Sequence, residues 1–287
     1  MRRSWRAVVA GLILSFFCAS AEGQPAPSEP SARLRDRGTG VPTSIFGTYV
    51  RGGEFLVSPF YEYYRDEDYE YAPEELGHPG EADYRGRYRA HEGLLFLAYG
   101  ITEDLAIEFE MAVIDASLEK DAADLSTVPA RIEESGLGDL EGQLRWRWHR
   151  ETDRRPEWFS YAEWVAPHHE DKPLIGTAGW QLKFGTGLVR GLAWGTLTAR
   201  AAVEYDEASS SHFDLGEYAV EYLRRLSPAW RVYAGIEGTQ DELELIGEIQ
   251  WHVASNVFFR FNSGVGVTSK ATDWAPDVGI VFSFGGR

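Results

Sequence analysis

Cysteine is nearly absent from this chain. The one cysteine among its 287 residues, Cys18, lies in an apolar stretch close to the N-terminus. The rest of the chain therefore has no disulfide framework, no thiolate metal site and no cysteine nucleophile. Basic residues are also scarce, since 28 Lys and Arg face 45 Asp and Glu and the formal net charge is −17. Nucleic acid is not an expected partner, because binding its phosphate backbone needs a basic surface.

Long apolar runs are missing, apart from a short one near the start. Residues 7–17 (AVVAGLILSFF) follow three arginines and precede the triplet Ala19-Ser20-Ala21. A positive start, a short apolar run and a small–x–small triplet form the pattern of a cleaved signal peptide. We therefore predict a signal peptide over residues 1–21 and export of the remaining chain.

Aromatic residues, by contrast, are abundant. They make up 14% of the chain and include ten Trp and fourteen Tyr, although the mean hydropathy is only −0.33. A soluble domain with this composition would need an unusually aromatic core. Strands that cross a membrane explain both observations, because only every second residue of such a strand meets lipid.

The apolar residues follow a period of two from residue 51 onward. The segment LAIEFEMAV, residues 105–113, is the clearest case, with five apolar side chains on one face and two glutamates on the other. A helix would scatter these positions around its axis, so the pattern indicates a strand. Residues 22–50 are rich in Pro and Ser and have no apolar period. We predict that they form a flexible periplasmic N-terminal segment.

About twelve such strands fit into residues 51–287, and short connections alternate with longer acidic or Ser/Gly-rich ones. This predicts an all-β fold, an antiparallel transmembrane β-barrel of about 12 strands with short periplasmic turns and longer extracellular loops, in the outer membrane of a Gram-negative bacterium. The expected strands lie near residues 54–64, 86–99, 105–113, 138–148, 157–166, 180–189, 196–205, 213–223, 230–238, 242–251, 257–268 and 277–284. The expected long loops are residues 66–83, 115–135, 167–179, 206–212 and 269–274.

Tryptophans gather beside the short connections. An indole ring has an apolar body and a polar N–H group, so it suits the level of the lipid headgroups. We predict an aromatic girdle at the periplasmic interface. Its members are Trp146, Trp148, Trp158, Trp194, Trp230 and Trp251.

Charged side chains occupy the faces opposite the apolar ones. An Arg or Lys that faces lipid at the membrane midplane costs roughly 2–4 kcal/mol, so the alternation assigns these charges to the lumen. The lumen-facing candidates are Glu108, Glu110, Asp139, Glu141, Arg145, Arg147, Lys183, Arg200, Glu204, Glu217, Glu221, Glu237, Glu248 and Arg260. Two interpretations stay open: a polar conduit, and a ladder of ion pairs that fills a narrow barrel.

Residues 135–148 (SGLGDLEGQLRWRW) resemble the GLGD-containing strand of the "MetA-pathway of phenol degradation" family of outer-membrane β-barrel transporters. Residues 99–111, 222–238 and 278–284 agree with the same family. The resemblance covers roughly residues 50–284 and implies a channel for passive passage of a small, hydrophobic or aromatic solute. The chain departs from the usual outer-membrane ending, because Phe284 is followed by Gly285-Gly286-Arg287. This bears on how the barrel assembly machinery reads the C-terminus.

No enzyme and no cofactor is expected. A lipid hydrolase needs a Ser with a His in reach, but Ser211 and His212 are adjacent and alternate faces, and no G-x-S-x-G occurs.

Residues 168–171 (HHED) could recruit a metal ion, although a solvated loop explains them better. Residues 65–83 are acidic and could hold cations that bridge lipopolysaccharide, or form a charged loop. The expected partners are outer-membrane lipid and lipopolysaccharide, a small-molecule solute and the assembly machinery, with the protein a monomer. A structural or adhesive barrel is the competing function.

Overall fold

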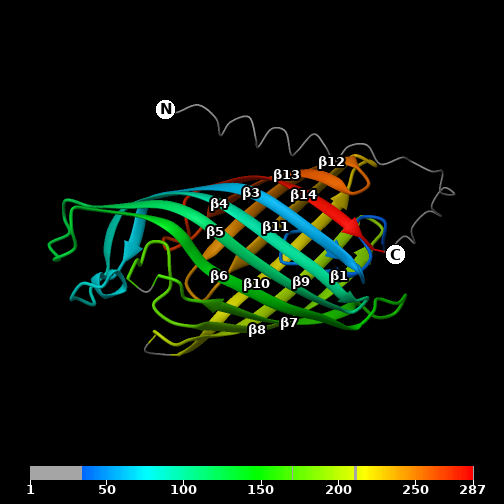
Figure 1. Cartoon of the computed structure of the whole chain (residues 1–287), viewed down its shortest axis with the longest axis horizontal. Coiled ribbons are helices and arrows are strands. Elements are labelled where there is room, and N and C mark those ends of the chain that lie inside the picture. The colour runs from blue at the N-terminus through cyan, green and yellow to red at the C-terminus, as the bar shows by residue number, and fades with distance from the viewer. Residues whose placement is uncertain (1–33, 170, 210–211, 287) are drawn as a thin grey trace, which may run out of the picture. The chain divides into compact units, whose positions relative to one another are not determined.

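The computed structural model describes residues 34–169, 171–209 and 212–286. The predicted signal peptide lies outside them. Within the described residues, twelve antiparallel strands close into a barrel in which each strand pairs with its sequence neighbours and the last strand pairs with the first (Figure 1). The strands are β3 (Glu54–Tyr71), β4 (Tyr84–Thr102), β5 (Leu105–Lys120), β6 (Arg131–His149), β7 (Glu157–Ala166), β8 (Gln181–Leu192), β9 (Gly195–Asp206), β10 (Phe213–Arg225), β11 (Trp230–Gly238), β12 (Leu243–Ala254), β13 (Val257–Gly266) and β14 (Ala275–Gly285). The predicted fold class and strand number are confirmed.

Alternation of side chains explains why these segments form a closed sheet. On β5, Ala106 and Glu108 are buried inside the barrel, whereas Met111 and Val113 on the opposite face are 38% and 61% exposed. A closed sheet leaves no unpaired edge, so every strand can satisfy its backbone groups along both sides. No helix in the described part of the chain is long and apolar enough to cross a membrane.

The connections divide the barrel into two ends. At one end, which we call the short-turn end, the strands are joined by residues 103–104, 150–156, 193–194, 226–229 and 255–256. The opposite end carries the longer connections, except that residues 239–242 are also short. We call it the long-loop end.

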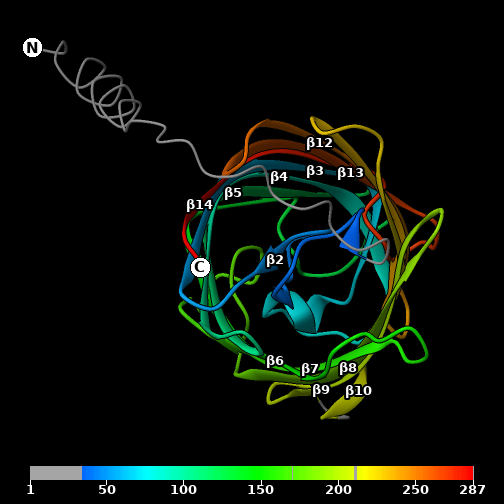
Figure 2. The same cartoon turned by 90° about the vertical axis from the view of Figure 1, so that its right-hand side faces the viewer.

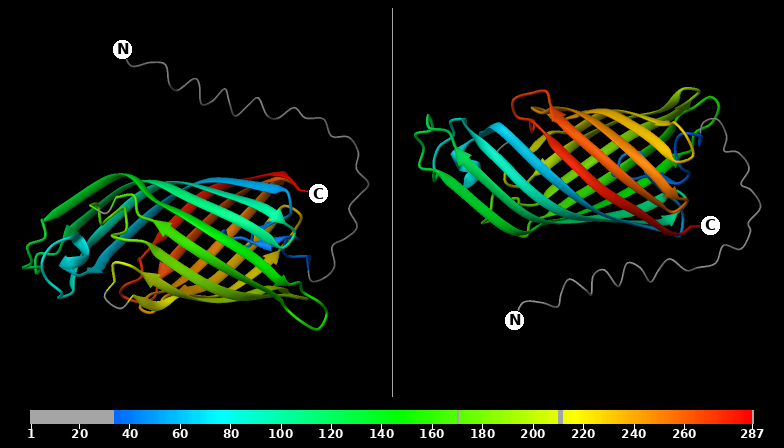
Figure 3. Two further views of the ribbon diagram at one scale, coloured as in Figure 1. Left: turned by 60° about the horizontal axis from the view of Figure 1, so that its bottom comes forward. Right: turned by 90° about the horizontal axis from the view of Figure 1, so that it is seen from above.

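Four strands are longer than the sequence predicts. Strands β3 to β6 have 16 to 19 residues, while the other barrel strands have 9 to 13. They project beyond the rest of the barrel at the long-loop end (Figures 1 and 3). The prediction that residues 66–83 and 115–135 form loops is therefore wrong in part, because strands continue to residue 71 and residue 120 and β6 begins at residue 131. We call residues 66–71, 84–90, 115–120 and 131–136 the strand extension.

The two faces of the sheet exchange character in the strand extension. On β4, Leu95, Leu97 and Tyr99 point outward near the short-turn end, whereas Arg87 and Arg89 point outward in the extension. The inward face of the extension is apolar instead. Its buried side chains form a cluster, the extension core, together with Leu76 of the 3-10 helix η3 (Pro73–Leu76) and three loop residues. The extension core consists of Tyr71, Leu76, Ala90, Ala116, Leu118, Val128, Leu174 and Ile175. The acidic composition of the two expected loops hid this pattern.

Residues 34–50 also differ from the expected flexible segment. They fold inside the barrel at the short-turn end, where β1 (Val41–Pro42) and β2 (Tyr49–Val50) pair with each other (Figure 2). Val41 and Val50 are fully buried, in a cluster with inward side chains of β3, β4 and β5. Burial of these apolar side chains orders a segment that has no apolar period of its own. We call residues 34–50 the plug segment.

Candidate functional site: the lumen

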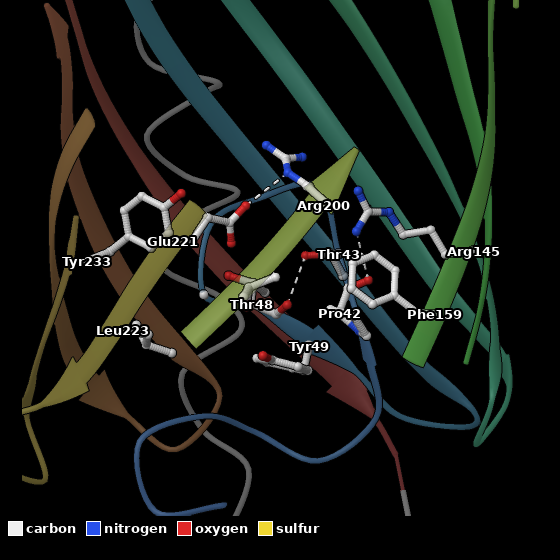
Figure 4. A pocket seen from close by; sticks show the side chains of 12 residues that line it. Pro42, Thr43, Thr48, Tyr49, Arg145, Phe159, Arg200, Glu221, Leu223 and Tyr233 are labelled. Atoms are coloured by element: carbon white, nitrogen blue, oxygen red, sulfur yellow. Dashed lines mark hydrogen bonds and ion pairs between the residues drawn. The ribbon is translucent and has the colours of Figure 1, made fainter. Parts of the chain in front are cut away.

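Arg145 of β6 joins the plug segment to the barrel wall. Its guanidinium Nη1 donates a hydrogen bond to the carbonyl oxygen of Pro42 at 3.1 Å (Figure 4). Its Nε lies 3.6 Å from Oε1 of Glu108. The rings of Phe159 and Tyr161 lie 5.8 and 5.1 Å from the guanidinium carbon. Such a buried cation is stable only when it is paired and hydrogen-bonded. The plug segment thus supplies part of the environment that Arg145 needs.

Two more arginines repeat this arrangement at the short turns. Arg37 of the plug segment pairs with Glu157 at 3.0 Å and with Glu151 at 2.8 Å. Arg147 of β6 reaches in the other direction and donates a hydrogen bond to the carbonyl oxygen of Gly40. The plug segment thus provides a cation to carboxylates outside it, and the wall provides a cation to a carbonyl oxygen of the plug segment.

Asp104 anchors the turn between β4 and β5. Its carboxylate accepts hydrogen bonds from Arg150 at 2.8 Å and from Arg147 at 2.9 Å. The hydrogen bonds from Arg150 are the chief reason why the pKa of Asp104 lies below its usual value, against a smaller opposite effect of burial. Arg147, which binds the plug segment at Gly40, is thus also fixed to the turn between β4 and β5.

Further contacts hold the tip of the plug segment. The backbone N–H and the hydroxyl of Ser44 donate to Oε2 of Glu108 at 3.0 and 2.7 Å. Gln250 of β12 donates to the carbonyl oxygen of Phe46 at 3.0 Å, and the Phe46 ring stacks on Tyr233 with centroids 4.6 Å apart. These contacts come from opposite sides of the barrel, so the tip spans the lumen.

Arginine and lysine side chains of β8, β9 and β13 are also paired. Arg200 lies 2.5 Å from Glu217, 3.0 Å from Glu221 and 2.8 Å from Glu237. In addition, Lys183 pairs with Glu163 at 3.0 Å, and Arg260 pairs with Glu248 at 3.2 Å and Asp277 at 2.7 Å. Lys183, Arg200 and Arg260 are therefore already bound by carboxylates of the wall.

Carboxylates oppose one another in the long-loop half of the lumen. Glu62 lies directly across from Glu92 in the pairing of β3 with β4, and Glu110 lies directly across from Glu141 in the pairing of β5 with β6. Within the described residues, none of these four has a Lys or Arg at ion-pair distance, and like charges in directly opposed positions destabilise a sheet. This part of the wall is rich in carboxyl groups that no Lys or Arg occupies, and it is available to a solute or to water.

Connected cavities fill this half of the lumen. One of about 360 Å³ is lined by the four carboxylates and Tyr64, and a second of about 320 Å³ shares Glu62 and Tyr64 with it. A third of about 160 Å³ shares Glu110 and Glu141. We call this connected space the acidic chamber. A pocket between the plug segment and the wall has a volume of about 20 Å³, which is room for about one water molecule.

The predicted lumen residues lie in three places. The structure puts Glu110, Glu141, Lys183, Glu217 and Glu237 on the acidic chamber, and Glu204 on a cavity of about 420 Å³ at the long-loop rim. The residues around the plug segment or in buried ion pairs are Glu108, Arg145, Arg147, Arg200, Glu221, Glu248 and Arg260. Asp139 differs, because its carboxylate binds backbone N–H groups of the segment that follows β7.

Sequence reasoning missed Glu62, Glu92 and Tyr64, as well as the contacts of the plug segment. Glu62 and Glu92 lie on inward positions of strands that the period already predicts, so alternation could have found them. The plug contacts join residues 64 to 204 positions apart, and no local pattern indicates them. No group of three or more His, Cys, Asp or Glu side chains among the described residues is placed to hold a metal ion.

The predicted girdle tryptophans all lie near the short-turn end. Trp148 and Trp158 have ring centroids 5.5 Å apart, and Trp230 stacks on Trp251 with centroids 5.9 Å apart. Five of the six are 42–55% exposed on the outside of the barrel, and Trp158 is half-buried.

The fold is the closed antiparallel barrel of bacterial outer-membrane proteins. No protein-family model matches the chain, and no curated protein matches it. Among solved structures, an outer-membrane channel from Pseudomonas putida F1 is similar over 85% of this chain and 100% of its own length, with 14% identity and a TM-score of 0.58. The translocator domain of the autotransporter NalP from Neisseria meningitidis is similar over 81% of this chain and 88% of its own, with 11% identity and a TM-score of 0.50. Both likenesses concern the fold.

Proposed function

We propose that the protein is an outer-membrane channel for passive passage of a small solute. The acidic chamber is the observation that carries this proposal. Cavities that share lining residues lead from the long-loop rim through the chamber to the plug segment. A barrel built only as a scaffold would be expected to fill this volume with side chains.

The outside of the barrel supports a place in the membrane. Val113, Phe184, Val203 and Val220 are 55–61% exposed, on the outward faces of four different strands. A continuous apolar surface of this kind is rare on soluble proteins and suits contact with lipid. The girdle tryptophans would then mark the periplasmic headgroup level, the strand extension would meet lipopolysaccharide, and the assembly machinery would read β14.

The plug segment closes the path in this structure, but it is not part of the hydrogen-bonded sheet of the barrel. Its two strands pair only with each other, so no barrel strand depends on them for backbone hydrogen bonds. It is held by side chains and by a small apolar cluster. Passage of a solute would require this segment to shift toward the short-turn end.

The lining indicates which solutes are favoured. Unpaired carboxylates attract cations, tolerate neutral molecules and repel anions. Leu94, Ile114 and Tyr64 add apolar and aromatic surface to the same cavity. The finer proposal is a small hydrophobic or aromatic solute that is neutral or cationic. This agrees with the resemblance of the GLGD strand to the phenol-degradation family, since a phenol is neutral near neutral pH.

A second candidate function is a non-conducting structural or adhesive barrel. The filled short-turn half favours it, because the plug segment and buried ion pairs leave almost no free volume there. In that case the acidic chamber would be a closed vestibule.

Reconstitution separates the two functions. The purified chain, shown to be folded by its heat-dependent mobility on semi-native gels, is placed in planar bilayers and in liposomes with phenols, alkylamines and sugars. The channel proposal expects single-channel conductance with a preference for cations, and swelling with at least one solute. A folded barrel that shows neither conductance nor swelling would contradict it.

A further inference from the structure

The GLGD stretch of β6 contacts the segment that follows β7, which lines the acidic chamber. We call residues 171–177 of that segment the inner arm. The two carboxylate oxygens of Asp139 accept hydrogen bonds from the backbone N–H groups of His168 at 2.7 Å and Thr177 at 2.6 Å. One side chain therefore binds the backbone just before the arm and at the last residue of the arm.

Two further hydrogen bonds attach the arm to the same strand. Lys172 Nζ donates to the carbonyl oxygen of Ser135 at 2.9 Å, and the backbone N–H of Leu174 donates to Glu134 at 2.8 Å. Leu174 and Ile175 are buried in the extension core. Polar contacts on one side and apolar burial on the other thus hold the arm inside the barrel rather than outside it.

The two glycines of the GLGD stretch allow this close approach. Gly136 has a φ of +151°, which L side chains rarely adopt, and a Cβ atom there would lie 3.4 Å from Lys172 Nζ. At Gly138, a Cβ atom would lie 2.8 Å from the Ile114 side chain and 3.4 Å from the Ile175 carbonyl oxygen. The pairing with β5 also shifts register at this point. Glycine and a bulge together let the strand bend toward the arm.

The arm is also part of the chamber wall. Residues 173–177 line the cavity of about 360 Å³, opposite Glu62 and Glu92. Movement of the arm would therefore change the width of the space that a solute has to pass.

We propose that the inner arm is the constriction of the long-loop half of the channel, separate from the closure by the plug segment, and that Asp139 is the positioning residue that sets its width. The carboxylate of Asp139 binds two backbone donors, which distinguishes it from the unpaired carboxylates of the chamber. The sequence motif is then an attachment site for the arm and contributes to size selection. This proposal rests on the proposed channel function.

The first experiment tests attachment of the arm without any transport. Ile175→Cys reports on the arm because Ile175 is 4% exposed, and Leu125→Cys is the accessible reference because Leu125 is 89% exposed. In the full folded chain, a membrane-impermeant maleimide should label the cysteine at position 175 slowly. Asp139→Ala should raise that rate at least tenfold and leave the rate at position 125 unchanged. An unchanged rate at position 175 would overturn the attachment.

The second experiment measures the size limit by liposome swelling with neutral sugars of increasing mass. Asp139→Ala should admit larger sugars than the unaltered chain. Asp139→Asn keeps one acceptor oxygen, so its size limit should lie in between, and it carries the test if the alanine variant does not fold. The matched control is Glu133→Gln, on the outward face of the same strand, which should leave both readouts unchanged. Faster labelling with an unchanged size limit would overturn the constriction. If no sugar passes any variant, the channel function fails, while the labelling result still decides the attachment.

Discussion

The two halves of the lumen differ in how they treat charge. In the short-turn half, Arg145 is buried against Glu108 and the plug segment, and Arg37 is bound by two glutamates. In the long-loop half, Glu62 faces Glu92 and Glu110 faces Glu141 without a basic partner among the described residues. The same alternation of side chains produces both halves. The difference lies in whether opposite or like charges meet across the strands.

Under the proposed channel function, the short-turn half would close the lumen and the long-loop half would contact solutes. Removal of one partner from a buried ion pair costs about 3–5 kcal/mol, because the other charge is left unpaired. Opposed like charges each cost a few tenths to about 1 kcal/mol. A barrel with a complete ladder of strand hydrogen bonds can tolerate the second cost, and the result is a carboxyl-rich surface whose four opposed glutamates have no Lys or Arg of the described residues at ion-pair distance.

Deletion of residues 34–50 should have the largest effect, because it removes the closure altogether. We expect conductance to rise on the order of tenfold, since the lumen of a twelve-stranded barrel is wide enough for an open path once its filling is gone. Ser44→Ala, which removes one of the two hydrogen bonds to Glu108, should give a much smaller rise. Planar-bilayer recordings measure both. A folded deletion variant with unchanged conductance would show that the path is blocked elsewhere.

Arg145→Ala should have the next largest effect. It leaves Glu108 buried without its cation, so we expect the free energy of unfolding to fall by roughly 3 kcal/mol. Arg150→Ala is the matched control, because its pair with Asp104 is exposed and should cost less than about 1 kcal/mol. Urea unfolding in lipid vesicles gives both values. Glu108→Gln added to Arg145→Ala should recover part of the loss, and equal losses for the two arginines would contradict the assignment.

The sequence predicts the inner and outer faces of the strands well, because lipid on one side and polar contents on the other impose a period of two. Residues 105–113 show this directly, and the position of every barrel strand follows from the same rule. Two parts could not be predicted. The plug segment depends on partners far along the chain, and the strand extension keeps the period but reverses the faces, so its charged residues resemble a loop.

Asp139 shows a further limit of sequence reasoning. Alternation assigns its side chain to the inside, with Glu141 and Arg145. It cannot tell whether a carboxylate faces solvent or binds backbone N–H groups of another segment. The two neighbouring glycines are the available signal, because they indicate that something approaches the strand closely.

Neutralisation of the acidic chamber should have a moderate effect. Glu110→Gln combined with Glu141→Gln removes one opposed pair, so the preference for cations should fall by about two- to threefold. The same change should raise the free energy of unfolding by up to about 1 kcal/mol. Glu119→Gln combined with Glu133→Gln, on the outward face of the strand extension, is the control and should leave selectivity unchanged. Reversal potentials in a salt gradient measure the cation preference. An unchanged preference in the Glu110→Gln, Glu141→Gln variant would contradict a role of these carboxylates in selectivity.

The pH dependence of the short turn should be the smallest effect. The pKa of Asp104 is lowered in the folded protein, chiefly by hydrogen bonds from Arg150. A lowered pKa contributes stability above the ordinary value of about 3.9, and this contribution is lost as the pH falls through the lower folded value. Asp104→Asn should therefore unfold at lower urea than the unaltered chain at about pH 7, with a gap that shrinks below about pH 4. A gap that widens in acid would contradict this sign.

The extension core has a thermal consequence. Its apolar side chains are shielded from water, whereas the exposed apolar side chains on the outer face of the barrel would contact lipid in the proposed membrane location. Exposure of apolar surface to water raises the heat capacity, so opening the extension should carry a positive heat-capacity change and its stability should decline on cooling. Loosening of a face that contacts lipid would expose little new surface to water and would lack this signature. The chain therefore combines, in four continuous strands, a part with the calorimetric behaviour of a small water-soluble domain and a part without it.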